Sequence, residues 1–282
     1  MKDLAYYNGE YGLIDEMKIP YNDRVNFFGD GVYDVTYVRD RVPFALMEHL
    51  DRFYNSAALL DIKIPVTKAE FAKTVMEMSE KVDSPDQFLY LQATRGTANR
   101  VHTYSEDMTA NLWIMIRPGK IKDVFTDVTA ITTEDTRFFH CNIKTLNLLP
   151  SVMYAQQAKR AGVYETILYR KPDRVTECAH ANVHIINKRG EFQTAPTDNL
   201  ILPGIARAHL IKACKALNIA VREEAFSLSD LMDAREVIIS SSSAIAMHCV
   251  EIDGKPVGGK DPEKLRAIQQ WVLDEYNDKS RN

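Results

Sequence analysis

The chain has 282 residues, of which 45% are hydrophobic and 26% are charged, a balance typical of globular rather than disordered proteins. Its length predicts two domains, since a single domain usually has roughly 100 to 200 residues. A formal net charge of −4 excludes a strongly basic surface, so we expect small-molecule partners and neither nucleic acid nor an anionic membrane.

The first 118 residues predict an α+β domain, because period-two strand patterns alternate with helical spacing of apolar residues. A hairpin is expected over residues 4–14, with its turn at Asn8-Gly9. The other expected elements are strands at 31–38, 42–46, 88–94 and 112–116, and helices around 50–58 and 71–82, the second after the cap-like Thr67.

The segment Arg117-Pro118-Gly119-Lys120 breaks this pattern and predicts a linker at residues 119–122, followed by a second domain over 123–282. In the second domain a capping box is expected at Ser227 to Asp230. Strands are expected at 124–132, 165–169, 175–177, 182–187, 191–195 and 236–240, and helices at 149–161, from 205 to about 217, from 228 and at 261–276.

The cysteines and the N-terminal residues indicate the cellular compartment in which the protein is expected. Cys141, Cys178, Cys214 and Cys249 are widely spaced and form no CxxC pair, so neither a zinc site nor a disulfide framework is expected. The first residues lack a basic region followed by an apolar run, and no stretch approaches the roughly 18 apolar residues that span a bilayer. A cytoplasmic location is therefore expected.

Four local features suggest chemistry, although each also has an ordinary structural explanation. Ser240 to Ser243 follow an apolar strand and could bind an anion or simply form a polar turn. Gly204 precedes a helix whose free N–H groups favour phosphate, but most helix starts have no ligand. Lys144 lies in an apolar setting that favours the neutral amine needed for Schiff-base chemistry, and Glu177 ends a strand; either side chain could instead be solvated.

The order and spacing of seven motifs resemble the fold-type IV pyridoxal-phosphate enzymes, and bacterial D-amino-acid aminotransferases in particular. The motifs are Phe28 to Asp34, Glu48 to Arg52, Thr94 to Gly96, Ile143 to Asn147, Val175 to Glu177, Ile201 to Arg207 and Glu251 to Lys255. The resemblance covers nearly the whole chain. It implies a two-domain α+β fold with pyridoxal 5′-phosphate in the cleft between the domains.

The resemblance also implies roles for individual residues. Lys144 is similar to the catalytic lysine that forms the Schiff base and moves the substrate proton, and Glu177 to the acid that holds the cofactor's ring nitrogen. The expected phosphate-binding residues are Arg52, Ile205, Ala206, Ser241 and Ser242.

The substrate class follows from a further set of residues. Arg100 and His102 resemble the carboxylate trap of D-amino-acid aminotransferases, a pair of residues that one subunit of a homodimer contributes to the active site of the other. Tyr33 and Tyr90 are expected to line that active site from its own subunit. The implied reaction is ping-pong transfer of the amino group of D-alanine-like donors to 2-oxoglutarate or pyruvate. Branched-chain L-amino-acid aminotransferase and 4-amino-4-deoxychorismate lyase are alternatives on this fold, and a non-catalytic metabolite-binding protein is a third.

Two departures from the family pattern concern these sites. Cys178-Ala179-His180-Ala181 replaces a glycine and a run of serines, so His180 is expected to contact the substrate carboxylate or to narrow the side-chain pocket. Ala206 replaces a frequent threonine, which removes one hydroxyl from the phosphate site. The expected loss of cofactor affinity is roughly 0.5–1.5 kcal/mol, the contribution of one hydrogen bond.

Overall fold

The structure is a computed structural model that describes residues 1–278, which form two compact units. The first unit contains Met1–Lys120 together with Ile143–Asn147, and the second contains Ile121–Asn142 and Leu148–Asp278. The sequence suggested a single division at residues 119–122. Ile143–Asn147 instead returns to the first unit, and this segment carries Lys144, one of the candidate residues singled out in the sequence.

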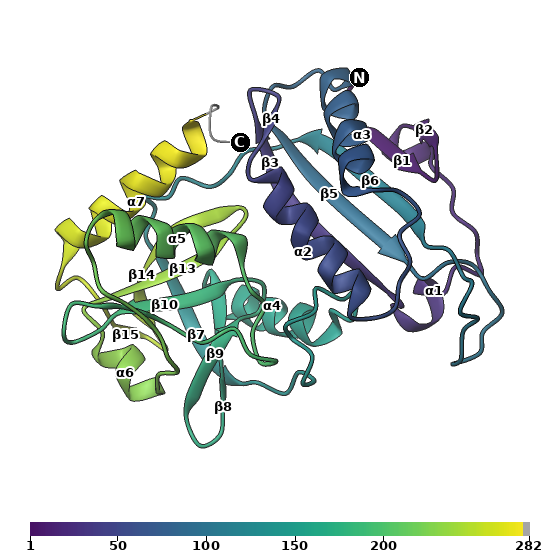
Figure 1. The fold of residues 1–282 in the computed structure, drawn as a ribbon. Coiled ribbons are helices and arrows are strands. Elements are labelled where there is room, and N and C mark those ends of the chain that lie inside the picture. The colour runs from purple at the N-terminus through teal and green to yellow at the C-terminus, as the bar shows by residue number, and fades with distance from the viewer. Residues whose placement is uncertain (279–282) are drawn as a thin grey trace. The chain divides into compact units, whose positions relative to one another are not determined.

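The first unit is built on a six-stranded antiparallel sheet with the strand order β2-β1-β6-β5-β3-β4 (Figure 1). Its strands are β1 (Leu4–Tyr7), β2 (Glu10–Gly12), β3 (Gly31–Arg39), β4 (Val42–Pro43), β5 (Gln87–Thr94) and β6 (Asn111–Pro118). The predicted hairpin turn is confirmed, since Asn8 and Gly9 both have positive φ angles, of 48° and 99°.

Helices α2 (Leu46–Ala58) and α3 (Lys68–Lys81) bury their apolar sides against the sheet, and two short turns, η1 (Ile14–Glu16) and α1 (Val25–Phe28), precede β3. Leu50 and Phe53 from α2 and Phe71 from α3 are among the fully buried side chains. Thr67 caps α3 in a capping box with Glu70, which confirms the predicted start of this helix. Figure 1 shows α2 lying along β3, the strand that carries Tyr33 and Asp34.

One strand of the first unit is shorter than predicted. The sequence suggested a return strand over residues 42–46, but β4 ends at Pro43 and α2 begins at Leu46. Ala45 between them has a φ angle of 50°, and this left-handed residue turns the chain from the sheet into the helix. Apolar residues alone do not distinguish a short strand from the first turn of a buried helix.

The second unit is built on a nine-stranded mixed sheet with the order β12-β11-β10-β13-β14-β7-β8-β9, in which β15 also pairs with β14. β7 pairs in parallel with both β8 and β14. The strands are β7 (Val128–Glu134), β8 (Glu165–Arg170), β9 (Arg174–Cys178), β10 (Asn182–Ile186), β11 (Phe192–Thr194), β12 (Val221–Glu223), β13 (Glu236–Ser241), β14 (Ala244–Ile252) and β15 (Lys255–Pro256). Because β9 contacts β10, which follows it after a short turn, the sheet is curled.

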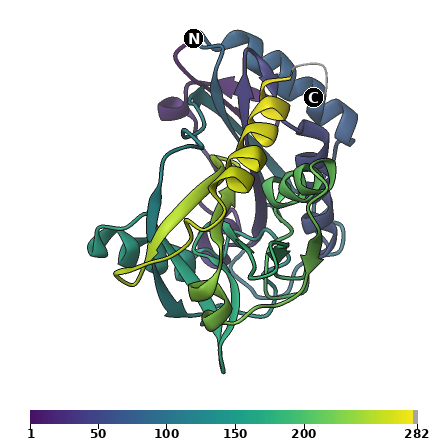
Figure 2. The ribbon, with the colours of Figure 1, turned by 90° about the vertical axis from the view of Figure 1, so that its left-hand side faces the viewer.

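Four helices complete the second unit: α4 (Leu149–Ala161), α5 (Ile205–Ala216), α6 (Leu228–Asp233) and α7 (Pro262–Asn277). The predicted bounds of α4 and the capping box of Ser227 with Asp230 at α6 are confirmed. Figure 2 shows α7 (yellow) running along β14, a strand that the sequence analysis did not predict. None of the helices within residues 1–278 is long and apolar enough to cross a bilayer.

Candidate active site

The backbone of Lys144 is fixed to the start of β3 in the first unit. The carbonyl oxygen of Lys144 accepts a hydrogen bond from the Tyr33 amide at 3.0 Å, and the Lys144 amide donates to Ser56 Oγ of α2 at 3.2 Å. The neighbouring Leu146 amide donates to the Gly31 carbonyl at 3.0 Å. A Cβ atom on Gly31 would lie 2.6 Å from the Ala93 carbonyl oxygen, so a glycine is required for this close approach.

The side chain of Lys144 is half-buried beside two tyrosines. Its Nζ lies 4.3 Å from the centroid of the Tyr33 ring, which itself stacks on Tyr90 at a centroid distance of 5.8 Å. The Tyr90 hydroxyl donates to Gln92 Oε1 at 2.6 Å, and burial raises the pKa of Tyr90, so this phenol stays neutral. The structure therefore brings together Lys144, Tyr33 and Tyr90, three of the residues predicted from the sequence.

Arg52 lies on α2 and is held by Asp34 of β3. Its Nε donates to Asp34 Oδ2 at 2.8 Å and its Nη2 donates to Asp34 Oδ1 at 2.7 Å, a bidentate pair that fixes the plane of the guanidinium. His49 Nδ1 also lies 2.7 Å from Asp34 Oδ1. Burial alone would raise the pKa of Asp34, but Arg52 and His49 hold it well below its usual value. Asp34 is therefore an anion that orients a buried arginine.

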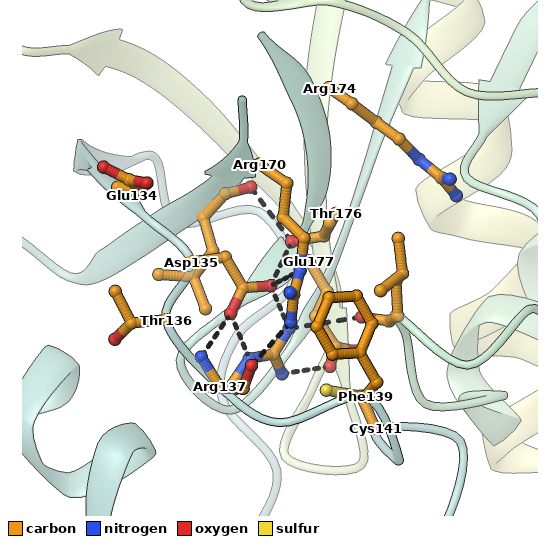
Figure 3. A network of polar contacts seen from close by, with 12 residues as sticks. Glu134, Asp135, Thr136, Arg137, Phe139, Cys141, Arg170, Arg174, Thr176 and Glu177 are labelled. Atoms are coloured by element: carbon orange, nitrogen blue, oxygen red, sulfur yellow. Dashed lines mark hydrogen bonds and ion pairs between the residues drawn. The ribbon is translucent and has the colours of Figure 1, made fainter. Parts of the chain in front are cut away.

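Glu177, at the end of β9 in the second unit, is buried and accepts hydrogen bonds on both oxygens (Figure 3). Arg137 forms an ion pair with Oε1, while Asn182 Nδ2 and the Leu202 amide each donate to Oε2 at 3.0 Å. Burial raises the pKa of Glu177, and the ion pair with Arg137 opposes the rise.

Arg137 is in turn fixed by Asp135, and Figure 3 shows its guanidinium between the two carboxylates. Arg137 Nε donates to Asp135 Oδ1 at 3.0 Å and Nη2 donates to Oδ2 at 2.9 Å. Asp135 also accepts from Thr176 Oγ1 at 2.9 Å and pairs with Arg170. Burial alone would raise the pKa of Asp135, but Arg137 lowers it, and the two carboxylates raise the pKa of Arg137. The result is a buried network of opposite charges around Glu177.

The start of α5 lies against the same carboxylate through Asn182. Gly204 precedes α5 and gives it no side-chain cap, while Ile205 and Ala206 in its first turn are buried. A Cβ atom on Gly204 would lie only 2.0 Å from Asn182 Oδ1, so glycine is required here. Asn182 Nδ2 donates to the Leu202 carbonyl at 3.1 Å as well as to Glu177. An uncapped helix start of this kind favours an anion.

The predicted serines lie at the turn between β13 and β14. Ser241 and Ser242 are half-buried, and Ser241 Oγ lies 3.3 Å from Ser243 Oγ. Ser240 has a different role, because it is buried and its hydroxyl lies 2.8 Å from His184 Nε2. Burial lowers the pKa of His184, so this histidine is neutral and supports the strand from inside the unit.

Arg100 and His102 lie in the loop between β5 and β6 and are exposed. Their ring contacts within the described residues are with Phe28: the Arg100 guanidinium lies 5.5 Å from the Phe28 centroid, and the His102 ring lies 5.2 Å from it. The structure brings these two residues together on Phe28, but it records no contact between them and Tyr33.

His180 lies in the turn between β9 and β10 and forms an ion pair with Glu165, a carboxylate that is fully buried at the start of β8. Its side chain remains 56% exposed, and its ring centroid lies 6.5 Å from that of Tyr164. The sequence analysis gave His180 a role toward the substrate and did not foresee Glu165 as its partner.

The sequence analysis also missed Arg137 and Asp135. Both lie in the segment after β7, which carries no motif that was compared with the family, and arginine and aspartate two residues apart are common on protein surfaces. The only available signal was their position, a few residues before the Lys144 motif.

The family of the chain is shown by comparison with known proteins, which identifies an aminotransferase. The chain belongs to the class IV aminotransferases, because the family model described as amino-transferase class IV matches residues 31–252. The family expected from the seven motifs is therefore confirmed, and so is the fold.

Individual relatives agree with this assignment. The chain is similar to the D-alanine aminotransferase of Bacillus licheniformis, with 35% identity over 95% of this chain and 97% of that protein. It also resembles the solved branched-chain amino acid aminotransferase of Escherichia coli, with a TM-score of 0.89 and 22% identity, over 97% of this chain and 94% of that one. A hypothetical aminotransferase from Mycobacterium tuberculosis, solved in its PLP-bound form, has a TM-score of 0.83 and 19% identity over 96% of this chain and 99% of its own.

Proposed function

We propose that the chain is a pyridoxal-phosphate-dependent D-amino-acid transaminase that moves the amino group of D-alanine or a similar donor to 2-oxoglutarate or pyruvate. The choice of the D-series rests on the likeness to D-alanine aminotransferases over almost the whole chain. The likeness to branched-chain enzymes is lower in sequence and concerns the fold alone. The observation that carries the proposed chemistry is a half-buried lysine, Lys144, whose amine is held beside the Tyr33 ring.

The chemistry of the residues around Glu177 fits the cofactor. A carboxylate has about four acceptor positions, and Glu177 uses three of them, for Arg137, Asn182 and the Leu202 amide. The fourth suits a protonated ring nitrogen, which would be a charged donor in a buried setting. We assign Glu177 to this contact, and Arg137 to keeping Glu177 ionised despite its burial.

The phosphate of the cofactor would be held by a set of backbone and side-chain donors. We assign this role to the uncapped N–H groups of Ile205 and Ala206 and the hydroxyls of Ser241 and Ser242 in the second unit, and to the guanidinium of Arg52 in the first unit. A helix start, hydroxyls and a guanidinium are the donors that a dianion favours. Asp34 keeps Arg52 in one orientation, so the arginine loses little conformational entropy when it binds the phosphate.

When bound, pyridoxal phosphate supplies a charged ring that acts as an electron sink for the electrons of a broken Cα–H bond. Lys144 would take the proton from Cα of the donor, which leaves as a 2-oxo acid, and in the second half-reaction it would give a proton to Cα of the amino acid formed from the acceptor. Its backbone is fixed by Tyr33 and Ser56, which limits the region that its amine can reach. The Tyr33 ring lies against that amine on one side, and Tyr90 stacks on Tyr33.

The substrate carboxylate is assigned to Arg100 and His102 of the other subunit in a homodimer. Both side chains are exposed in the single chain, as expected for residues that contribute to the active site of a second copy. A carboxylate fixed on one side, with the Lys144 amine on one cofactor face, lets only one enantiomer aim its Cα–H bond at the amine. We assign to the exposed part of His180 the role of limiting the size of the substrate side chain.

We also propose a cytoplasmic location. The four cysteines are all buried free thiols. Thiols persist in the reducing cytoplasm, whereas exported proteins more often carry disulfides.

The test is a comparison of D-alanine and L-leucine as donors with 2-oxoglutarate as acceptor, in which the glutamate product is resolved by chirality. The proposal predicts D-glutamate from D-alanine and little product from L-leucine. Faster turnover of L-leucine would instead assign the chain to the branched-chain enzymes. Pyruvate release from aminodeoxychorismate without an acceptor would assign it to the lyases.

A further inference from the structure

The loop that carries Arg100 and His102 has almost no regular secondary structure of its own. Residues 95–110, between β5 and β6, contain only an isolated bridge at Thr97. A loop of this length is entropically costly to order, and its side chains can act on a ligand only if other residues fix its backbone.

Arg24 fixes the centre of this loop. It is 2% exposed, and its guanidinium donates to the Val101 carbonyl at 2.7 Å, the His102 carbonyl at 3.2 Å and the Thr103 carbonyl at 3.3 Å. The same side chain donates through Nε to Asp30 Oδ2 at 2.7 Å. A rigid guanidinium can bridge several acceptors in one plane, which an ammonium group cannot do.

Asp30 links Arg24 to a second buried arginine, Arg95. Arg95 Nε lies 3.0 Å from Asp30 Oδ1 and 2.9 Å from Oδ2. The Arg95 guanidinium lies 3.7 Å from the centroid of Tyr104, the residue that follows the carbonyls held by Arg24. One carboxylate therefore orients two arginines that contact neighbouring parts of the loop.

Phe28 connects this arrangement to the two exposed side chains. The Arg24 guanidinium lies 4.9 Å from the Phe28 centroid, and Arg100 and His102 contact the same ring at 5.5 and 5.2 Å. The ring thus sets the direction of Arg100 and His102, while Arg24 sets the backbone between them.

We infer that Asp30, Arg24 and Arg95 form a clamp that preorganises the loop of Arg100 and His102 for binding a substrate carboxylate. The inference rests on the proposed function for the identity of the ligand, whereas the order of the loop is independent of it. Arg24 is a positioning residue, because it acts through the backbone of the loop. Its loss should weaken carboxylate binding more than it slows the chemistry, since Lys144 and Glu177 are untouched.

The experiment compares Arg24→Lys with a matched control, Arg41→Lys. Arg41 lies in the same unit and its Nη1 also donates to three backbone carbonyls, those of Ser79, Glu80 and Val82, at 3.0, 3.2 and 3.1 Å. Two readouts are taken: hydrogen exchange of the amides of residues 99–105, and kcat and KM for D-alanine. Tyr104→Leu is a second variant at an exposed position that removes the stacking on Arg95 and a hydrogen bond from the Tyr104 hydroxyl to Asp61 Oδ2 at 3.4 Å, and leaves the ion pairs in place.

Arg24→Lys should speed hydrogen exchange of the amides of residues 99–105 about tenfold. It should also raise KM for D-alanine about tenfold, while kcat stays within about threefold of wild type. Tyr104→Leu should also speed exchange and raise KM, but by smaller factors. Arg41→Lys should leave both the exchange rates and the kinetic constants unchanged. The clamp is overturned if exchange in both loop variants matches that of Arg41→Lys.

The two proposals fail in different ways. If exchange is faster but KM is unchanged, in an enzyme whose Arg100→Ala variant does raise KM, the positioning role is overturned. If the wild-type chain does not transaminate D-alanine, the proposed function fails, and the exchange measurement alone decides whether the clamp exists.

Discussion

The guanidinium of Arg137 forms an ion pair with the carboxylate of Glu177, and both side chains are less than 10% exposed. Asp135 binds the opposite edge of the same guanidinium, so one cation separates two buried carboxylates. The charge of Glu177 depends on this arrangement, because burial by itself favours the protonated acid.

Removal of the charge of Arg137 should therefore affect both stability and cofactor binding. We predict that Arg137→Met loses about 3–5 kcal/mol of unfolding free energy, since it leaves the buried Glu177 without its cation and leaves Asp135 with Arg170 alone. It should also weaken binding of pyridoxal phosphate, because a protonated Glu177 no longer accepts a hydrogen bond from a charged ring nitrogen. Urea unfolding of the apoprotein and titration with the cofactor measure the two effects.

The matched control is Arg189→Met. Arg189 pairs with Glu191 at 2.9 Å, but its side chain is 65% exposed, so its loss should cost no more than about 1 kcal/mol. Equal losses in the two variants would contradict the importance of the buried pair. Arg137→Lys, which keeps the charge, should recover part of the cofactor affinity.

Lys144→Ala should abolish turnover but leave the cofactor bound without a covalent bond. The expected signs are no measurable transamination of D-alanine, and pyridoxal phosphate that remains through rapid gel filtration but leaves on dialysis. Lys68→Ala, at an exposed lysine paired with Asp51, is the control and should keep full activity. Turnover by the Lys144 variant near the wild-type rate would eliminate this lysine as the catalytic base.

Gly204→Ala tests the packing between the start of α5 and Glu177. The new methyl group would lie 2.0 Å from Asn182 Oδ1, so Asn182 must move and its hydrogen bond to Glu177 is lost. We predict at least about tenfold weaker cofactor binding, the effect of losing roughly one to two hydrogen bonds. Gly12→Ala is the control, because the nearest atom to its added methyl is Met17 Cε at 3.6 Å. Unchanged cofactor binding in the Gly204 variant would show that Asn182 does not support the site.

His248 should make stability depend on pH. Its Nδ1 lies 2.9 Å from Asp127 Oδ1 and its Nε2 lies 3.0 Å from Glu236 Oε2. Burial alone would lower the pKa of His248, but the two carboxylates raise it above its usual value of 6.5. Because the folded state binds the proton more tightly, the stabilisation is complete below pH 6.5 and is lost as the pH rises through the raised pKa.

The comparison is between wild type and His248→Gln, with unfolding free energies measured at about pH 6 and about pH 9. The difference between the two proteins should be larger at the lower pH and should shrink at the higher one. The carboxylate of Glu236 acts in the opposite direction, because its pKa is lowered in the fold and its contribution is lost as the pH falls below its usual 4.5. A difference that grows from pH 6 to pH 9 would contradict the account.

Much of the fold follows from local sequence signals. Thr67 and the pair Ser227 with Asp230 marked two helix starts, and Asn8-Gly9 marked a hairpin, because each signal depends on neighbouring residues alone. β14 was missed because its pattern, Ala-Ile-Ala-Met-His-Cys-Val-Glu-Ile, does not alternate cleanly. Such a buried central strand is apolar on both faces, and one of its partners, β7, lies far away in the sequence.

The site was predicted unevenly for a similar reason. Lys144, Tyr33 and Tyr90 lie together although they are far apart in the chain, and it was the resemblance to a family, not a local pattern, that grouped them. Arg137 and the Glu165 partner of His180 were not foreseen, since each ion pair joins segments whose meeting depends on strand pairing. The return of residues 143–147 to the first unit is likewise a consequence of tertiary pairing with β3, which no local pattern encodes.

The most direct test of the central claim is a single-turnover reaction of the cofactor-loaded protein with D-alanine or L-alanine, without an acceptor, in which pyruvate is counted per chain. The account predicts about one pyruvate per chain from D-alanine and almost none from L-alanine, since the donated amino group stays on the enzyme until an acceptor arrives. Equal yields from both enantiomers, or continued pyruvate release without an acceptor, would contradict it.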